Sequence, residues 1–433
     1  MKRHAFDSLK AWKADPARKP LVLRGARQVG KTWLLQEFGR EQYPKVVYVN
    51  CQRDKSVAAV FEGDLDPDRI LRGLEVVAKS AVDPETTLVI IDEIQEVPAA
   101  LTALKYFEEQ RRDVHVATAG SLLGVALHAN ESFPVGKVNF LDLHPLDFDE
   151  FLRGVGEEQL AELVLKQDWT LIHSFRDRLI ELLRLYMFVG GMPEAVARYV
   201  KKDSLDSIRA TQLDILRGYE NDFAKYADAG ESRRIAEVWA SMPAQLAREN
   251  KRFILGHVRE GARAREFEGA IQWLSDAGLV HRVTLYTKPA NLIRTYENKS
   301  IFKLFLHDVG LLGALSGLDQ AVLLQGAGIF EEFKGALTEQ YVLQQIVATR
   351  NEMPMYWGRS SERSQAELDF AIERAETLVP IEVKAEENLR SKSLRNYIDR
   401  FKPDQALRFS LADYREQEDM TNVPLYGIGP WLK

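Results

Sequence analysis

The sequence predicts an α/β protein with a parallel sheet in its first 150 residues. Two observations carry this prediction: an apolar run leads into a glycine-rich turn at 21–32, and four consecutive apolar residues lead into two acids at 88–93. Apolar segments alternate with amphipathic ones, with strands expected at 20–24, 45–50, 87–92 and 114–118 and helices at 31–40, 68–80 and 98–111. Such alternation is typical of βαβ units, whose helices cover both faces of the sheet.

The glycine-rich turn has the spacing of a phosphate-binding loop. Residues 25–32 follow the pattern G-x-x-x-x-G-K-T between the first strand and the first helix of the sheet. The two glycines allow a tight turn whose N–H groups face phosphates, and the helix that follows points its partial positive end at the same anion. Lys31 is expected to reach the β- and γ-phosphates, and the Thr32 hydroxyl to hold Mg²⁺. We therefore expect ATP and Mg²⁺ as cofactors, with loop contacts from Gly25, Gln28, Gly30, Lys31 and Thr32.

Polar residues follow two further strands. Ligands of open α/β sheets bind at the carboxyl ends of the strands, which places Asp92 and Glu93 beside the phosphate loop. Asp92 is expected to hold Mg²⁺, either directly or through its other ligands, and Glu93 to orient the attacking water as a base. After the next strand, Thr118 or Ser121 can sense the γ-phosphate. A turn residue at a strand end is the equally good alternative for both.

Composition limits the location and the partners. The 433 residues suffice for about three domains of ordinary size. No apolar run approaches the roughly 20 residues that span a bilayer, and the first residues lack the apolar core of a secretion signal, so we expect a cytoplasmic protein without membrane contact. A net charge of −6 gives no general attraction to nucleic acid. Any DNA contact must therefore come from a local basic patch.

The chain after the parallel sheet looks helical. Residues 151–230 are expected to form a helical lid, interrupted at 189–193 by two glycines and a proline that mark a sharp turn. A helix at 263–277 followed by a strand-like segment at 279–286 suggests a winged helix over 231–315.

A cluster of basic residues accompanies the expected winged helix: Arg248, Lys251, Arg252, Arg259, Arg263 and Arg265. These side chains can form a phosphate-contacting face for DNA. Glutamates are interleaved among them, so a solvated helix surface is the other interpretation.

A third group of charged residues lies near the C-terminus. Apolar and polar residues alternate at 366–385 on both sides of a polar turn, which predicts a hairpin. The alternation places Asp369 on one face of the first strand, and Glu382 and Lys384 on the matching face of the second. Two carboxylates can hold Mg²⁺, and the lysine can assist a metal-bound water or neutralise a phosphodiester transition state. Glu339, on an upstream helix, or Glu367 can supply a further ligand, although edge strands also carry charges without any metal.

With these motifs placed, the chain resembles a family of prokaryotic P-loop ATPases of the AAA+ type that join an N-terminal ATPase to a distinctive C-terminal region. The resembling stretches are 25–32, 90–95, 143–152, 190–193, 366–370 and 380–384. The resemblance implies ATP binding at the loop, the usual roles for Asp92 and Glu93, and assembly into a homo-oligomer. It assigns residues 1–150 to the ATPase.

The C-terminal region, residues 325–433, resembles the PD-(D/E)XK nuclease fold, with Asp369, Glu382 and Lys384 all present. One departure is Lys137, where similar chains are expected to carry arginine, and lysine lacks the bidentate fork of a finger that reaches a neighbour's nucleotide. The favoured function is ATP hydrolysis coupled to DNA cleavage or handling. The alternative is a regulatory nucleotide switch whose C-terminal domain only binds a partner, which the acidic net charge favours.

Overall fold

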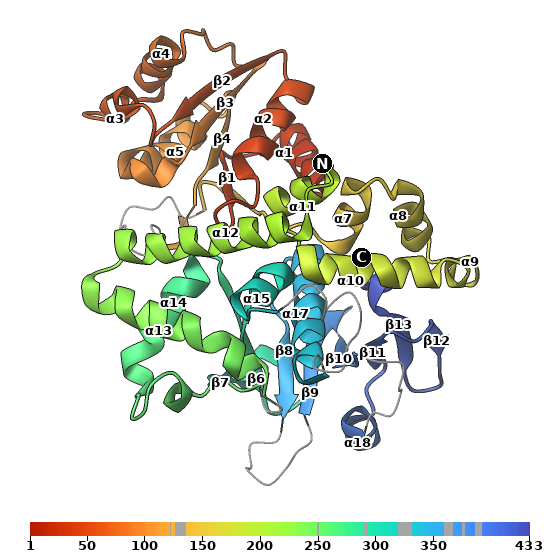
Figure 1. Cartoon of the computed structure of the whole chain (residues 1–433). Helices are drawn as coiled ribbons and strands as arrows, with labels where there is room; N and C mark the ends of the chain where they lie inside the picture. The colour runs from red at the N-terminus through yellow and green to blue at the C-terminus, as the bar shows by residue number, and fades with distance from the viewer. Residues whose placement is uncertain are drawn as a thin grey trace. The chain divides into compact units, whose positions relative to one another are not determined.

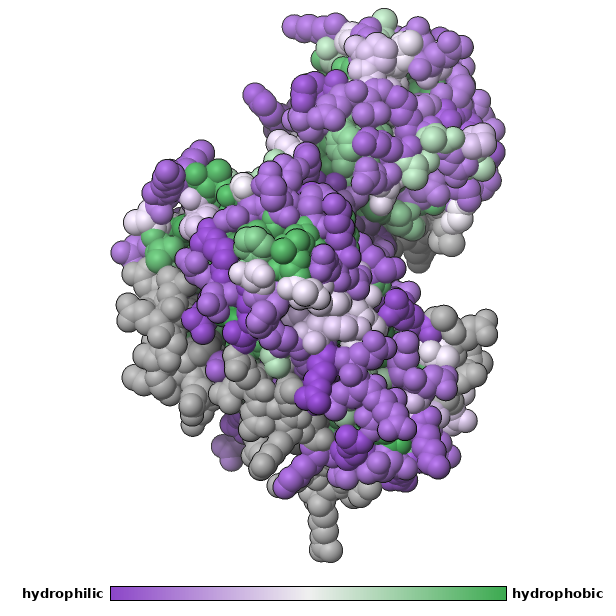
Figure 2. Space-filling model, turned by 90° about the vertical axis from the view of Figure 1, so that its right-hand side faces the viewer, coloured by the Kyte–Doolittle hydropathy of each residue, from purple (hydrophilic) through white to green (hydrophobic). Residues whose placement is uncertain are grey.

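The computed structural model describes residues 1–121, 123–125, 136–248, 251–289, 293–318, 331–358, 367–374, 377–385 and 392–433. The chain forms two compact units, Met1–His144 with Asp276–Gly278 and Pro145–Ser275 with Leu279–Lys433. The face drawn in Figure 2 is mainly hydrophilic, with apolar side chains in a few groups. Within the described ranges, no helix is both long and apolar enough to cross a membrane.

The first unit contains a five-stranded parallel sheet in the order β2-β3-β4-β1-β5. Its strands are β1 (Leu21–Arg24), β2 (Lys45–Asn50), β3 (Thr87–Asp92), β4 (His115–Ala119) and β5 (Asn139–Asp142). The first four confirm the predicted strands, and the α/β class is confirmed with them. Strand β5 was not predicted, because its four residues alternate too briefly to show a period.

Helices cover both faces of this sheet (Figure 1). They are α1 (Ala5–Ala14), α2 (Lys31–Gln42), α3 (Lys55–Val60), α4 (Pro67–Ala78) and α5 (Pro98–Gln110). Apolar residues of α3, α4 and α5 form one core with the strands, and every residue of β3 is buried. A strand covered on both faces needs a continuous apolar run, which is why 88–91 carry no polar residue.

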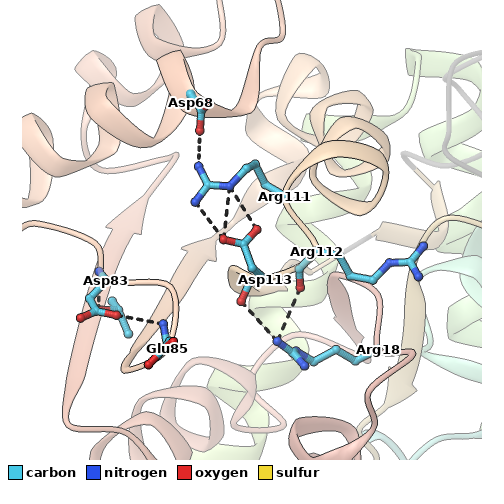
Figure 3. A network of polar contacts seen from close by, with 8 residues as sticks. Arg18, Asp68, Asp83, Glu85, Arg111, Arg112 and Asp113 are labelled. Atoms are coloured by element: carbon cyan, nitrogen blue, oxygen red, sulfur yellow. Dashed lines mark hydrogen bonds and ion pairs between the residues drawn. The ribbon is translucent and has the colours of Figure 1, made fainter.

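A polar network ties the amino end of β4 to the helices around it (Figure 3). Arg111 forms ion pairs with Asp68 and, at 3.0 Å, with Asp113. Arg18 donates a hydrogen bond of 3.3 Å to the carbonyl of Asp113, just before β4. The phosphate loop follows the carboxyl end of β1, which is parallel to β4. This network therefore lies at the opposite edge of the sheet from the phosphate loop.

The second unit begins with helices, as predicted for 151–230. They are α7 (Phe148–Gly154), α8 (Glu158–Leu165), α9 (Trp169–His173), α10 (Arg176–Val189), α11 (Pro193–Val200) and α12 (Leu205–Tyr226). The predicted break lies between α10 and α11. Gly190 has φ +73°, and a Cβ there would lie 2.3 Å from Oδ1 of Asp308. The buried Asp308 carboxylate accepts a 2.7 Å hydrogen bond from the Gly191 N–H, so the glycines are needed for a close contact inside this unit.

An eight-stranded mixed sheet fills the rest of the second unit, in the order β12-β13-β11-β10-β9-β8-β6-β7. Its strands are β6 (Val280–Tyr286), β7 (Glu297–Leu306), β8 (Met355–Gly358), β9 (Glu367–Arg374), β10 (Thr377–Val383), β11 (Leu407–Ser410), β12 (Arg415–Glu416) and β13 (Thr421–Pro424). The helices around it are α13 (Ala229–Leu246), α14 (Ala264–Asp276), α15 (Val309–Leu315), α17 (Glu331–Arg350), α18 (Lys392–Phe401) and α19 (Ile428–Leu432).

The strand-like segment predicted after the helix at 263–277 is β6, which follows α14 and forms an antiparallel hairpin with β7. Strand β6 also pairs in parallel with β8, so the hairpin belongs to the same sheet as the C-terminal strands. The division into a domain at 231–315 and another at 325–433 stays a prediction. The hairpin predicted at 366–385 is β9 with β10; residues 366, 375 and 376 lie outside the described residues.

Candidate functional site

The phosphate loop connects β1 directly to α2. Gly25 has φ +143°, and a Cβ there would lie 2.2 Å from the carbonyl oxygen of Leu143. Gly30 has φ +96° at the N-cap of α2, and Gln28 also has a positive φ of 67°. The loop therefore adopts the left-handed backbone that the two glycines were expected to permit.

Lys31 is the first residue of α2, and its side chain lies under the loop. Its exposed fraction is 7%, and its Nζ donates to the carbonyl oxygens of Gly25 (2.9 Å) and Ala26 (2.8 Å). Burial lowers the pKa of Lys31 to about 8, against the opposing effect of the nearby Glu93 and Asp92 carboxylates. Among the described residues this ammonium has carbonyl oxygens rather than an anion in direct contact, which suits a group that is to meet a phosphate.

Thr32 and Asp92 meet at the end of β3. The Thr32 hydroxyl donates a 2.9 Å hydrogen bond to Oδ2 of Asp92, whose exposed fraction is 2%. Tyr48 donates to the same oxygen at 2.8 Å, and the Asn50 amide lies 3.4 Å from it. A hydroxyl and a carboxylate side by side are oxygen ligands of the kind that Mg²⁺ takes, so the donor set fits the expected ion.

Tyr48 and Asn50 were missing from the sequence-based site. Both lie on β2, and Asn50 is the register partner of Asp92. The sequence offered one signal, because Asn50 is a polar residue at the carboxyl end of the strand that precedes the acidic one.

Glu93 follows β3 with φ +50°, and two side chains hold its carboxylate. Oε2 accepts hydrogen bonds from Gln95 at 2.7 Å and from Ser121 at 3.1 Å. Ser121 therefore reaches the acid that is expected to orient water. Thr118, the alternative, is fully buried and donates to the carbonyl oxygen of Leu21 at 3.0 Å, so its hydroxyl is engaged within the sheet.

Lys137 lies just before β5 and contacts the helix beside it. Its Nζ forms ion pairs with Glu108 at 2.9 Å and Glu109 at 3.1 Å. Hydrogen bonding to Lys137 holds the pKa of Glu108 below its usual value. Lys137 is thus tied to α5 of its own unit, and its neighbour Pro134 lies outside the described residues.

The C-terminal candidates come together on one face of the second sheet. The described elements follow one another as α17, β8, β9, β10, α18 and β11, with β9 antiparallel to β10 and β10 parallel to β11. The register pairs Ile381 with Phe370, so Glu382 follows opposite Asp369. Oδ2 of Asp369 accepts a 2.7 Å hydrogen bond from the backbone N–H of Val383.

Burial and neighbouring charges set the protonation of these acids. Burial, with the nearby Glu339 and Glu382 carboxylates, raises the pKa of Asp369 well above its usual value. Burial alone would raise the pKa of Glu339 too, but Lys251 and Lys303 hold it below its usual value. Glu382 forms a 2.7 Å ion pair with Lys384. The predicted group of Glu339, Asp369, Glu382 and Lys384 is therefore one electrostatic cluster.

Three cations of this cluster were not predicted as part of it: Lys251, Arg252 and Lys303. Lys251 pairs with Glu339, and Arg252 lies 3.6 Å from Glu367. The first two had been assigned to the basic face for DNA, and the structure instead turns them toward the acids. The one available signal for Lys303 was a lysine inside an otherwise apolar strand, Phe302 to Leu306.

The rest of the basic group divides into paired and exposed side chains. Arg259 pairs with Glu237 at 3.4 Å and with Glu266 at 3.5 Å. Arg263 and Arg265 are exposed at the start of α14. Arg248 is exposed as well, and its guanidinium lies 2.8 Å from Nε2 of His257.

The C-terminal cluster offers oxygens to a cation but not a closed three-carboxylate cage. Oε2 of Glu339 and Oε2 of Glu382 are buried without a hydrogen-bond partner in the described part of the chain. Oxygens from Glu339, Asp369 and Glu382 do not all lie within 4.8 Å of one another among the residues that the structure describes. The donor chemistry fits Mg²⁺, and Asp369 with Glu382 is the pair that shares one strand register.

Three family models match successive parts of the chain. Residues 17–152 match an AAA domain. Residues 180–322 and 334–426 match two domains of unknown function, DUF8612 and DUF4143. No relative is found among curated proteins.

Three solved structures that match this chain share little sequence with it. The Walker-type ATPase PABY2304 of Pyrococcus abyssi is 13% identical, with 72% of this chain and 94% of that chain covered and a TM-score of 0.44. The Orc1 protein of Aeropyrum pernix in complex with DNA is 13% identical (73% and 93% covered, TM-score 0.31). Cdc6p of Pyrobaculum aerophilum is 11% identical (75% and 94% covered, TM-score 0.26). From its loop geometry and its family match, the segment at 17–152 is a P-loop ATPase domain of the AAA type.

Proposed function

We propose that this chain hydrolyses ATP with Mg²⁺ and couples hydrolysis to the cleavage or handling of DNA. The observation that carries the first half is the meeting of Lys31, Thr32, Asp92 and Glu93 at the phosphate loop. The AAA domain match over the same region supports it.

Each of these side chains has a role that its position supports. Lys31 would exchange its two carbonyl partners for the β- and γ-phosphates. Thr32 and Asp92 would hold Mg²⁺, which would supply positive charge to the phosphates. Glu93 would accept the proton of the attacking water, and Ser121 and Gln95 would keep its carboxylate in place until then.

The order helix, three strands, helix, strand in the C-terminal region supports the nuclease-like half of the proposal. Its register brings Asp369 and Glu382 together, and Lys384 follows two residues later. Asp369 and Glu382 would hold Mg²⁺, which polarises the scissile phosphate. Lys384 would place positive charge beside the phosphate oxygens as charge builds up on them.

One observation favours the alternative, a nucleotide switch with a C-terminal binding module. The acids of the cluster already have cationic partners: Lys384 pairs with Glu382, Lys303 with Glu367 and Lys251 with Glu339. A cluster neutralised from within does not need a metal ion for its charge balance. Cleavage of DNA is the property that separates the two functions.

The deciding experiment incubates the full chain with labelled single- and double-stranded DNA in Mg²⁺ or Mn²⁺, with and without ATP. Cleavage that disappears in Asp369→Ala and Lys384→Ala, while ATPase activity is kept, would support the nuclease. ATPase activity without cleavage of any DNA or RNA would leave the regulatory switch.

DNA handling has a separate test on α14. Charge reversal of Arg263 and Arg265 to Glu should weaken DNA binding and lower the slope of log K against log salt by about 1 for each phosphate that the variant no longer neutralises. Reversal of Arg217, an exposed arginine on α12, is the matched control. An unchanged slope in the α14 variant would mean that this face is only solvated.

A further inference from the structure

Lys303 is a buried cation inside the C-terminal acid cluster. Its side chain is 2% exposed, and its Nζ lies 2.7 Å from Oε1 of Glu367 and 3.7 Å from Oε2 of Glu339. The ring of Tyr356 covers it at 4.9 Å. Two carboxylates from different elements, α17 and β9, therefore face the Lys303 ammonium.

Lys251 reaches the same acids from a different segment. It follows α13, its side chain is 13% exposed, and it hydrogen-bonds Oε1 of Glu339. Glu339 therefore has a lysine beside each of its oxygens, with Lys303 on the other side. The positive charges on this side of the cluster come from residues ahead of α17, outside the predicted nuclease-like domain.

The other side of the cluster carries Lys384, whose Nζ lies 2.7 Å from Oε1 of Glu382 but whose side chain is 34% exposed, so this cation, unlike Lys303, can turn toward solvent. Oε2 of Glu382, on a side chain only 4% exposed, has no hydrogen-bond partner among the described residues. Asp369 faces it across the strand register and accepts one backbone hydrogen bond. The charge of Glu382 acts on Asp369, and two neighbouring carboxylates repel unless a proton or a cation lies between them.

We propose that Lys303 and Lys251 are resident cations that occupy the Glu339–Glu367 side of the cluster, and that they restrict divalent metal to a single ion at Asp369 and Glu382. The proposal depends on the proposed nuclease-like function in one respect, the divalent ion that is expected at Asp369 and Glu382. An ammonium at 2.7 Å from one carboxylate and 3.7 Å from another repels a second cation and satisfies the charge that would attract it. The cluster thus takes one hard divalent cation, not a pair.

The test is a Mn²⁺ titration of the nucleotide-free full chain by electron paramagnetic resonance. The Mn²⁺ binding that is lost in Asp369→Asn is assigned to the cluster. Wild type should bind one Mn²⁺ there, and Lys303→Met should bind Mn²⁺ at least tenfold more tightly or take up a second ion, because one positive charge is gone. Lys299→Met, an exposed lysine on the same strand, should titrate like wild type.

Two further variants cover the case in which Lys303→Met does not fold. Lys251→Met should also tighten binding. The double variant Lys303→Met with Glu367→Gln removes one charge of each sign and should return to the wild-type affinity.

Each outcome of the titration decides the proposal. Unchanged affinity and stoichiometry in folded Lys303→Met and Lys251→Met would overturn it, as would the absence of Asp369-dependent Mn²⁺ in all variants. Mn²⁺ bound by Lys303→Met but not by wild type would also overturn it, because wild type is expected to hold one ion there, and it would count against the nuclease as well. One Mn²⁺ in wild type without any DNA cleavage would keep the proposal and reject the nuclease.

Discussion

Lys31 shows how burial prepares a single side chain for an anion. It is almost fully buried, and its partners are carbonyl oxygens rather than carboxylates in direct contact. Desolvation lowers its pKa to about 8. Phosphates would restore the lost stabilisation of the charge, so binding of nucleotide and charging of Lys31 favour each other.

Substitutions at Lys31 and Glu93 should separate binding from turnover. Lys31→Ala should largely abolish ATP binding, because it removes the buried ammonium that is expected to meet the phosphates. Glu93→Gln should bind ATP but hydrolyse it about 100-fold more slowly or worse, because the group that accepts the water's proton is lost. Calorimetry and phosphate release measure the two effects, with Glu96→Gln as control. Equal turnover in Glu93→Gln and wild type would exclude Glu93 as the base.

His115 gives the first unit a pH-dependent stability. It is buried at the start of β4, with Nδ1 2.6 Å from the Tyr43 hydroxyl, and burial lowers its pKa to about 4. The unfolded chain takes up this proton near pH 6.5 and the folded chain only near pH 4, so stability should be flat above about 6.5 and fall between about 6.5 and 4. Urea midpoints should drop less over this interval in His115→Gln. Identical pH profiles for both proteins would refute the assignment.

At the scale of elements, the break between α10 and α11 is set by a contact far away in sequence. Gly190 has a backbone that only glycine adopts freely, and the Asp308 carboxylate occupies the space of a Cβ. The sequence marked a turn there, but its cause is a buried acid 117 residues after Gly191. That acid also follows β7 and caps α15, so one side chain joins three elements.

Gly190→Ala should therefore destabilise the second unit. The backbone strain alone amounts to about 1–3 kcal/mol, and the overlap with Asp308 adds to it. Denaturant unfolding measures the loss. Gly218→Ala, in the middle of α12 with open space around it, should instead leave stability unchanged or raise it by about 0.5–1 kcal/mol. Similar effects of the two substitutions would show that the Asp308 carboxylate does not constrain the turn.

At the scale of the whole molecule, self-assembly is the property that can be tested. Homo-oligomers are expected from the resemblance, yet Lys137 is paired with Glu108 and Glu109 of its own chain. We predict assembly into a ring or an open multimer when a non-hydrolysable ATP analogue and Mg²⁺ are present. Light scattering at micromolar protein checks it, with Lys31→Ala as the variant that should stay dissociated. A monomer under these conditions would contradict the prediction.

The sequence by itself determined the features that depend on local backbone. The phosphate loop was identifiable because Gly25 and Gly30 stand at two positions where the chain needs positive φ. The strands β1 to β4 were identifiable because a buried parallel sheet requires continuous apolar runs. The hairpin of β9 and β10 was predicted from alternation, which put Asp369 and Glu382 on one face.

Only the tertiary structure decided which charges meet. Lys251 and Lys303 lie 88 and 36 residues before Glu339, and neither belongs to a periodic pattern that points at an acid. Tyr48 reaches Asp92 because β2 pairs with β3. That pairing depends on the order of the strands within the sheet, which only the folded chain shows. Burial strengthens the Coulomb attraction within such ion pairs, but burial is a property of the packed chain. Local patterns therefore predict where backbone turns and strands lie, while partners of a charge follow only from packing.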